Sequence, residues 1–150
     1  MRKQRIDKLS SSCSTTDARA FASERSHGVI LRDRTIAAIR LNGEKNFSPP
    51  GGHLEVNESY EQALIRELKE EISITAYTQD FRPFKSYCEV LGATKTQRTS
   101  VFFVDKWSGL LQVGPKDQLK WVTYDYRLDS NADTELVKLL ELLKQEDLID

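Results

Sequence analysis

The stretch Ser48-Pro49-Pro50-Gly51-Gly52 limits how this chain can fold more than any other feature of its sequence. Consecutive prolines lack backbone N–H donors and have a fixed φ, and paired glycines favour turns, so we expect no helix or strand to cross this stretch. The chain has 150 residues, which is the size of one ordinary domain. The elements before and after the break must therefore be separate parts of a single domain.

Short runs rich in β-branched and aliphatic residues predict strands on both sides of the break. The predicted strands are residues 28–31, 35–41, 74–78, 84–90, 99–104 and 119–123. Residues 32–34 are expected to join the first two strands as a hairpin turn.

Two segments have the pattern of amphipathic helices. Ser59 and Gln62 form a capping box that starts a helix over residues 59–72. Leucines spaced i, i+3, i+4 and i+7 predict a second helix over residues 131–144, most simply packed on the core, with a dimer seam as the alternative. Strands that alternate with two helices predict an α/β (α+β) domain with a mixed β-sheet.

We place this single domain at residues 26–150. Residues 1–25 are rich in Ser and Arg and poor in acidic residues. This composition predicts a flexible or loosely docked N-terminal lead-in.

The composition excludes several classes of protein. Lys and Arg number 22 and Asp and Glu 23, for a net charge of −1, without the basic excess typical of a nucleic-acid-binding domain. The mean hydropathy is −0.52, and no apolar run approaches the ~20 residues of a membrane span. Cys13 and Cys88 lack metal-binding spacing, and we expect both to stay reduced. Together with a charged N-terminus in place of an apolar signal segment, this predicts a cytoplasmic protein.

The helix at 59–72 has a charged face opposite its apolar face. The charged face carries Arg66, Glu67, Glu70 and Glu71. Carboxylates at i, i+3 and i+4 project together, and like charges so close are costly unless a divalent cation neutralises them. Oxygen ligands of this kind suit Mg²⁺ or Mn²⁺. On the helix alone, however, a solvated charged face is the simpler interpretation.

The spacing between this face and the break favours the metal interpretation. Gly52 is followed after five residues by Glu58, and after seven more by the run from Arg66 to Ile74. This pattern resembles the Nudix box, G-x5-E-x7-R-E-U-x-E-E-x-G-U with U a bulky aliphatic residue, and matches eight of its nine specified positions. The segment from Phe47 to Gly52 and the acidic residue Glu55 are also similar to the family pattern.

The resemblance extends over residues 27–145. It implies a Nudix-type α/β/α sandwich with a mixed β-sheet between helices, and metal-dependent hydrolysis of a diphosphate linkage. Two positions depart from the usual glycines, Asn57 before the helix and Ser73 after it. Both positions are expected to need a positive φ, which Asn tolerates better than Ser. Neither departure removes a group that does chemistry.

The resemblance also implies a role for each box residue. The metal ligands would be Gly52 through its carbonyl, Glu67, Glu70 and Glu71. Glu67, Arg66 and Glu70 would form the catalytic group, with Glu67 as a further ligand or as the base that activates water. Glu58 would be the partner of Arg66 or an outer ligand, and Glu55 would support the site.

Other candidates lie outside the box. The base in some family members lies further along the chain, where this sequence offers Glu89, Asp105 and Asp117. The candidate substrate contacts are Arg40, which matches a basic family position, and the aromatic residues Phe84 and Tyr87, which can stack on a base. His27 and His53 lack metal-ligand spacing, and we expect both to be incidental.

The implied reaction is water attack on a diphosphate phosphorus with Mg²⁺ or Mn²⁺ as cofactor. Glu89 stands where ADP-ribose pyrophosphatases have proline, and Val90 and Leu91 stand where diadenosine polyphosphate hydrolases have tyrosine. By elimination, a nucleoside or deoxynucleoside triphosphate is the first expected substrate.

Three alternatives stay open. These are hydrolysis of an NDP-sugar or another nucleotide, a non-catalytic nucleotide-sensing module, and an RNA 5′-phosphate hydrolase that uses the basic lead-in. A small-molecule nucleotide is the expected partner of a monomer or homodimer, without nucleic acid or membrane.

Overall fold

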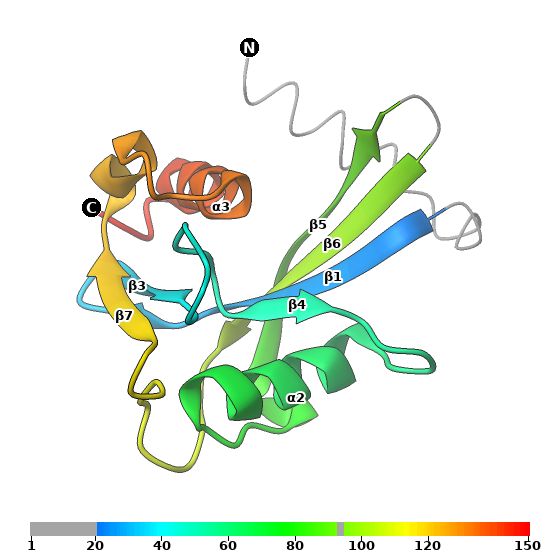
Figure 1. Ribbon diagram of the computed structural model, residues 1–150, viewed down its shortest axis with the longest axis horizontal. Coiled ribbons are helices and arrows are strands. Elements are labelled where there is room, and N and C mark those ends of the chain that lie inside the picture. The colour runs from blue at the N-terminus through cyan, green and yellow to red at the C-terminus, as the bar shows by residue number, and fades with distance from the viewer. Residues whose placement is uncertain (1–20, 93–94) are drawn as a thin grey trace.

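The computed structural model describes residues 21–92 and 95–150, in which strands alternate with helices (Figure 1). The strands are β1 (Phe21–Val29), β2 (Leu31–Arg32), β3 (Thr35–Arg40), β4 (Gly51–His53), β5 (Phe81–Leu91), β6 (Lys95–Val104) and β7 (Gln118–Val122). The helices are α2 (Tyr60–Ile72) and α3 (Thr134–Gln145), and the short 3₁₀ turns are η2 (Thr78–Asp80) and η3 (Tyr124–Leu128).

These strands form two sheets. The larger sheet has the order β4-β1-β6-β5 and is mixed, because β1 runs parallel to β6 and antiparallel to β4. The smaller sheet, β2-β3-β7, is antiparallel. The prediction of a mixed sheet is confirmed, and the structure adds the second sheet.

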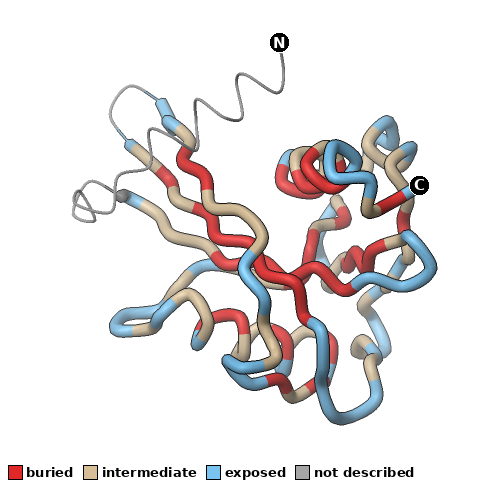
Figure 2. The backbone as a smooth tube through the Cα atoms, turned by 180° about the vertical axis from the view of Figure 1, so that it is seen from behind, coloured by how far each residue is buried: buried red, intermediate tan, exposed pale blue. Residues whose placement is uncertain are grey.

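The two helices cover opposite sides of the strands, as Figure 1 shows. Side chains alternate along β3, so that Ile36 and Ala38 join the core cluster under α3, whereas Ala37 and Ile39 join the cluster under α2. Figure 2 shows the resulting band of buried backbone through the centre of the molecule. The predicted α/β/α arrangement is therefore present.

The first strand is longer than predicted. β1 begins at Phe21, seven residues before the predicted start at 28, and residues 21–25 belong to the sheet instead of the lead-in. These residues are mostly polar, so their side chains gave no strand signal, but their backbone pairs with β6 and, at Arg25, with β4. The rest of the predicted lead-in lies outside the described residues.

Other boundaries also differ from the sequence prediction. Residues 74–78 are not a strand, because Ile74 and Ala76 fill the core beneath α2 while Thr75 makes only an isolated bridge to Ser108. The helix predicted at 131 begins at Thr134, where the side chain of Asp133 accepts the N–H of Leu136 at 2.7 Å.

The capping box of α2 is confirmed. The N–H of Gln62 donates to Ser59 Oγ at 3.0 Å, and the N–H of Ser59 donates to Gln62 Oε1 at 2.8 Å. The leucine stripe of α3 packs in the core as predicted, since all four leucines are buried beneath the helix.

One expectation about the cysteines is wrong. Cys88 is disulfide-bonded in the structure, and Cys13 lies outside the described residues. Cys88 is therefore no sign of a cytoplasmic location. None of the helices in residues 21–92 and 95–150 is long and apolar enough to cross a membrane.

Candidate active site

Two glycines of β4 bring the strand close to both β1 and α2. Gly51 has φ +133°, and a Cβ at this position would overlap the carbonyl oxygen of Ser26. A Cβ at Gly52 would lie 2.8 Å from Oε1 of Glu67. The absence of a Cβ at Gly51 therefore lets β4 lie close to β1, and the absence of a Cβ at Gly52 lets the carboxylate of Glu67 approach the strand.

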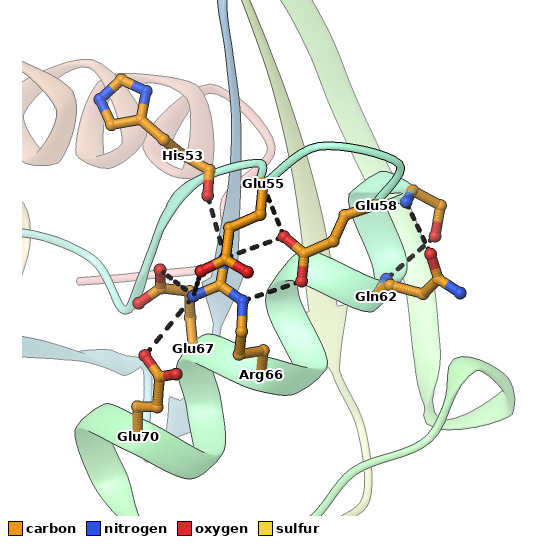
Figure 3. A network of polar contacts seen from close by, with 8 residues as sticks. His53, Glu55, Glu58, Gln62, Arg66, Glu67 and Glu70 are labelled. Atoms are coloured by element: carbon orange, nitrogen blue, oxygen red, sulfur yellow. Dashed lines mark hydrogen bonds and ion pairs between the residues drawn. The ribbon is translucent and has the colours of Figure 1, made fainter.

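Arg66 is the centre of the charged face of α2 (Figure 3). Its Nε and Nη2 donate to the two carboxylate oxygens of Glu58 at 2.8 and 2.9 Å. Its Nη1 donates to Glu67 at 2.9 Å and lies 3.5 Å from Glu70, and Nη2 also donates to the carbonyl of His53 at 3.1 Å. A guanidinium that uses its planar fork in this way holds several acids in fixed positions.

The turn before α2 presents Glu58 to this arginine. The N–H of Glu55 donates to Glu58 Oε1 at 2.7 Å, and Asn57 has the positive φ, +66°, that its position was predicted to need. Hydrogen bonding to Arg66 lowers the pKa of Glu58, while burial acts in the opposite direction. The Glu58 carboxylate is therefore kept ionised beside the guanidinium.

Glu71 has different surroundings from the other acids. Its Oε1 accepts the backbone N–H of Gly51 at 2.8 Å. Burial raises the pKa of Glu71 to about 8, and the negative charges of Glu67, Glu44 and Glu70 act in the same direction, against the Gly51 hydrogen bond. At neutral pH and without a cation, Glu71 is therefore mostly protonated.

The donor set fits a hard divalent cation. Glu67, Glu70 and Glu71 offer carboxylate oxygens on neighbouring turns of one helix, next to the backbone of Gly52. In the part of the chain that the structure describes, however, no three Asp, Glu, His or Cys side chains are gathered closely enough to hold a metal ion. Glu67 and Glu70 face Arg66 while Glu71 faces Gly51, so side-chain rotation is needed to converge on one ion.

The exit from α2 uses the second unusual residue. Ser73 is the C-cap and has φ +65°, the left-handed conformation predicted for this position. Serine adopts this conformation at some cost in free energy. The helix is nevertheless intact as far as Ile72, so the departure leaves the acids in register.

The candidate substrate contacts have different surroundings. The guanidinium of Arg40 lies 4.8 Å from the ring centre of Phe47, which Lys120 also approaches at 4.8 Å, and Arg40 hydrogen-bonds Gln118. Phe84 packs on the ring of Phe103 at 4.8 Å. Arg40 is thus placed on a cationic, aromatic surface, whereas Phe84 packs against the core.

Tyr87 is enclosed by the protein. It is 2% exposed, and its hydroxyl donates to Glu135 of α3 at 2.8 Å. In this conformation its ring has no free face on which a base can stack, so we do not include it in the proposed site.

Each acid suggested as a base outside the box has a partner of its own. Glu89 pairs with Lys138 at 2.5 Å, and Asp105 pairs with Arg82 at 3.1 Å. Asp117 accepts the N–H of Asn42 at 2.7 Å. None of the contacts described for these three acids joins them to the acids of α2.

Two backbone groups and one side chain contribute to the site in ways not anticipated from the sequence. The carbonyl of His53 fixes Arg66, and the N–H of Gly51 holds Glu71. Both are backbone groups, which residue types do not reveal. Glu44, in the loop after β3, adds negative potential at Glu71. Its position four residues after Arg40 gave no signal in the sequence.

Comparisons with known proteins match both the sequence and the fold of this chain. A family model described as the NUDIX domain matches residues 18–143. No curated protein matches the chain.

Several solved structures share its fold. The ORF135 protein of E. coli is 25% identical over 83% of this chain and 90% of that chain, with a TM-score of 0.67. The MutT NUDIX hydrolase of Burkholderia pseudomallei is 23% identical over 81% of this chain and 97% of that chain, with a TM-score of 0.64. A bifunctional NMN adenylyltransferase/ADP ribose pyrophosphatase of Francisella tularensis, in complex with AMP and a manganese ion, is 20% identical over 83% of this chain and 41% of that chain, with a TM-score of 0.54.

Proposed function

Because this chain belongs to the Nudix hydrolase family, which acts on nucleoside diphosphate derivatives, we propose that it hydrolyses a diphosphate bond of a nucleoside or deoxynucleoside triphosphate. The reaction would use Mg²⁺ or Mn²⁺. Its products would be a nucleoside monophosphate and pyrophosphate.

One observation carries the proposal. A single arginine, Arg66, binds Glu58 with its fork and reaches Glu67 and Glu70, while Glu71 is held by the N–H of Gly51. Every acid of the charged face is thus held at the junction of α2 and β4. A solvated face that served only solubility would not need this degree of positioning.

We assign the metal ligands to Glu67, Glu70, Glu71 and the carbonyl of Gly52. A bound divalent cation would polarise the phosphoryl group and stabilise the leaving oxygen. Arg66 would orient Glu67 and Glu70 through its contacts with them and with Glu58. Glu67 would be a further ligand or the group that takes the proton from the attacking water, as a general base.

The substrate assignment rests on elimination and on charge. The sequence lacks the residues expected of ADP-ribose and diadenosine polyphosphate hydrolases after the box. Arg40 and Lys120, which both approach the ring of Phe47, offer cations to phosphate groups. An NDP-sugar or ADP-ribose would carry fewer phosphate charges and use these cations less fully.

A product-release screen tests the proposal. Triphosphates, ADP-ribose, NDP-sugars, dinucleoside polyphosphates and 5′-triphosphorylated RNA are each incubated with Mg²⁺, with Mn²⁺ or with EDTA. We expect turnover of triphosphates only with metal, and a loss of about 100-fold or more in Glu70→Gln. Glu61→Gln, an acid substituted on the first turn of the same helix, serves as the matched control and should remain active.

The other outcomes are equally informative. Faster turnover of an NDP-sugar, ADP-ribose or RNA would reject the substrate class while keeping the reaction. Nucleotide binding without turnover of any compound would reject the reaction and favour a sensing module.

A further inference from the structure

His27 lies on β1, next to the strand β4 whose Gly51 N–H donates to Glu71. In the antiparallel pairing of β1 and β4, His27 is the partner of Gly51. Two residues before it in β1, Arg25 pairs with Glu135 of α3, and two residues after it, Val29 belongs to the core under α3. Since side chains alternate along a strand, His27 faces α3, whereas Glu71 approaches Gly51 from the α2 side.

The imidazole of His27 is an unusual side chain for this place. The residue is 6% exposed, and within the described residues neither ring nitrogen has a hydrogen-bond partner. The carbonyls of Pro49 and Pro50 lie near the ring without completing a hydrogen bond. A buried polar ring without partners costs free energy, so its hydrogen-bonding capacity does not explain its presence.

The shape of the ring gives a better explanation. A Cβ added to Gly51 would lie 2.9 Å from His27 Nδ1 and 2.8 Å from His27 Cα. The imidazole therefore packs against the backbone of Gly51. A peptide between Pro50 and Gly51 that turned toward this side of β4 would therefore meet the ring.

The peptide between Pro50 and Gly51 is hydrogen-bonded both to β1 and to Glu71 of α2. Its carbonyl, on Pro50, accepts the N–H of Gly28 at 2.9 Å, and its N–H, on Gly51, donates to Glu71 at 2.8 Å. Rotation of the peptide would break both hydrogen bonds and turn a carbonyl oxygen toward the carboxylate. The orientation of this single peptide thus decides whether Glu71 has a donor.

We propose that His27 is a positioning residue whose ring, by its volume, locks the peptide between Pro50 and Gly51 in the orientation that holds Glu71. The role does not require a charge or a hydrogen bond on the imidazole. An apolar side chain of similar volume should therefore replace it. The consequence for metal binding rests on the proposed function, but the lock itself does not.

Hydrogen exchange of the Gly51 amide in metal-free protein tests the lock directly. We expect His27→Ala to speed this exchange about tenfold or more relative to amides of the β1–β6 pairing, because local opening then exposes the N–H. His27→Leu should keep exchange at the wild-type rate. Thr99→Ala is the matched control, because Thr99 is likewise buried, has a hydroxyl with no partner among the described residues, and is separated from β4 by β1.

Metal titration supplies the second measurement. His27→Ala should weaken Mn²⁺ binding about tenfold, whereas His27→Leu and Thr99→Ala should not. If the His27→Ala protein does not fold, His27→Val, a milder truncation, takes its place. Mn²⁺ binding should again be weaker, and Gly51 exchange again faster, than in wild type. Equal Gly51 exchange in His27→Ala and Thr99→Ala, or fast exchange in His27→Leu, would overturn the proposal. Wild-type protein that binds no Mn²⁺ would instead count against the proposed function and leave the exchange result to decide the lock.

Discussion

Metal binding should be strongly pH-dependent, because Glu71 must lose a proton to become a ligand. Burial on α2, with Glu67, Glu44 and Glu70 nearby, raises the pKa of Glu71 to about 8. A cation and a proton compete for the same carboxylate, so binding releases the proton. Between pH 6 and 9 the charge of Glu71 therefore changes, whereas the matched variant Glu71→Gln has no proton to release.

The size of the effect follows from the pKa. With a value of about 8, the fraction of protein with ionised Glu71 is about 1% at pH 6, about 10% at pH 7 and about 90% at pH 9. The apparent dissociation constant for Mg²⁺ should therefore fall about tenfold per pH unit below 8 and level off above it. About 0.9 proton should be released per bound ion at pH 7.

Isothermal titration calorimetry measures both quantities. Mg²⁺ is titrated into metal-free protein at each pH, in two buffers with different enthalpies of ionisation, so that proton release appears as a difference in measured heat. Glu71→Gln should bind more weakly and without the steep slope. A dissociation constant that stays level from pH 6 to 8, without proton release, would show that Glu71 does not lose a proton when the ion binds.

The same group affects folding in the absence of metal. A raised pKa in the folded state means that unfolded protein holds fewer protons than folded protein between about pH 4.5 and 8. The contribution of Glu71 to stability is therefore fully present below about pH 4.5 and is lost as pH rises through about 8. Urea unfolding of metal-free protein should show a steeper loss of stability over this range than Glu71→Gln shows.

Three further substitutions test the geometry. Gly51→Ala should destabilise the protein by about 3 kcal/mol or more in urea unfolding, because the added Cβ would overlap a backbone carbonyl. Gly43→Ala, at φ +87° with open space around it, should cost only about 1 kcal/mol. Equal costs for the two substitutions would contradict the close packing at Gly51. Arg66→Lys should lower kcat/KM about 10- to 100-fold because the fork to Glu58 is lost, and an unchanged kcat/KM would argue against its orienting role. Ser73→Gly should raise stability by up to about 1 kcal/mol by relieving the left-handed conformation, a gain that Ser73→Ala should not show.

The parts of the structure that the sequence predicted well are those that side chains determine locally. Ser59 and Gln62 cap α2 because the two side chains, three residues apart, can each accept the backbone N–H of the other residue. The positive φ of Asn57 and Ser73 followed from their places at the two ends of the helix. The proximity of Glu58 and Arg66 followed from the box alone, and their two hydrogen bonds are present.

The parts that were missed depend on backbone pairing and tertiary packing. The polar half of β1, from Phe21 to Arg25, is a strand because β6 runs beside it, and its own side chains do not alternate in polarity. Ile74 and Ala76 have the composition of a strand but fill the core under α2. Likewise, the roles of Gly51 N–H and the His53 carbonyl arise from the register of β4, which residue types cannot specify.

The distribution of charge on α2 sets the conditions for cation entry. Arg66 stabilises the ionised form of Glu58 and donates a hydrogen bond to Glu67, whereas Glu71 avoids repulsion by holding a proton at neutral pH. An incoming cation must therefore compete with a guanidinium for Glu67 and with a proton for Glu71. Both costs weaken binding to the protein alone, while substrate phosphates supply oxygen ligands that require no such competition. We therefore expect the affinity for Mg²⁺ to be higher with a bound nucleotide than without it.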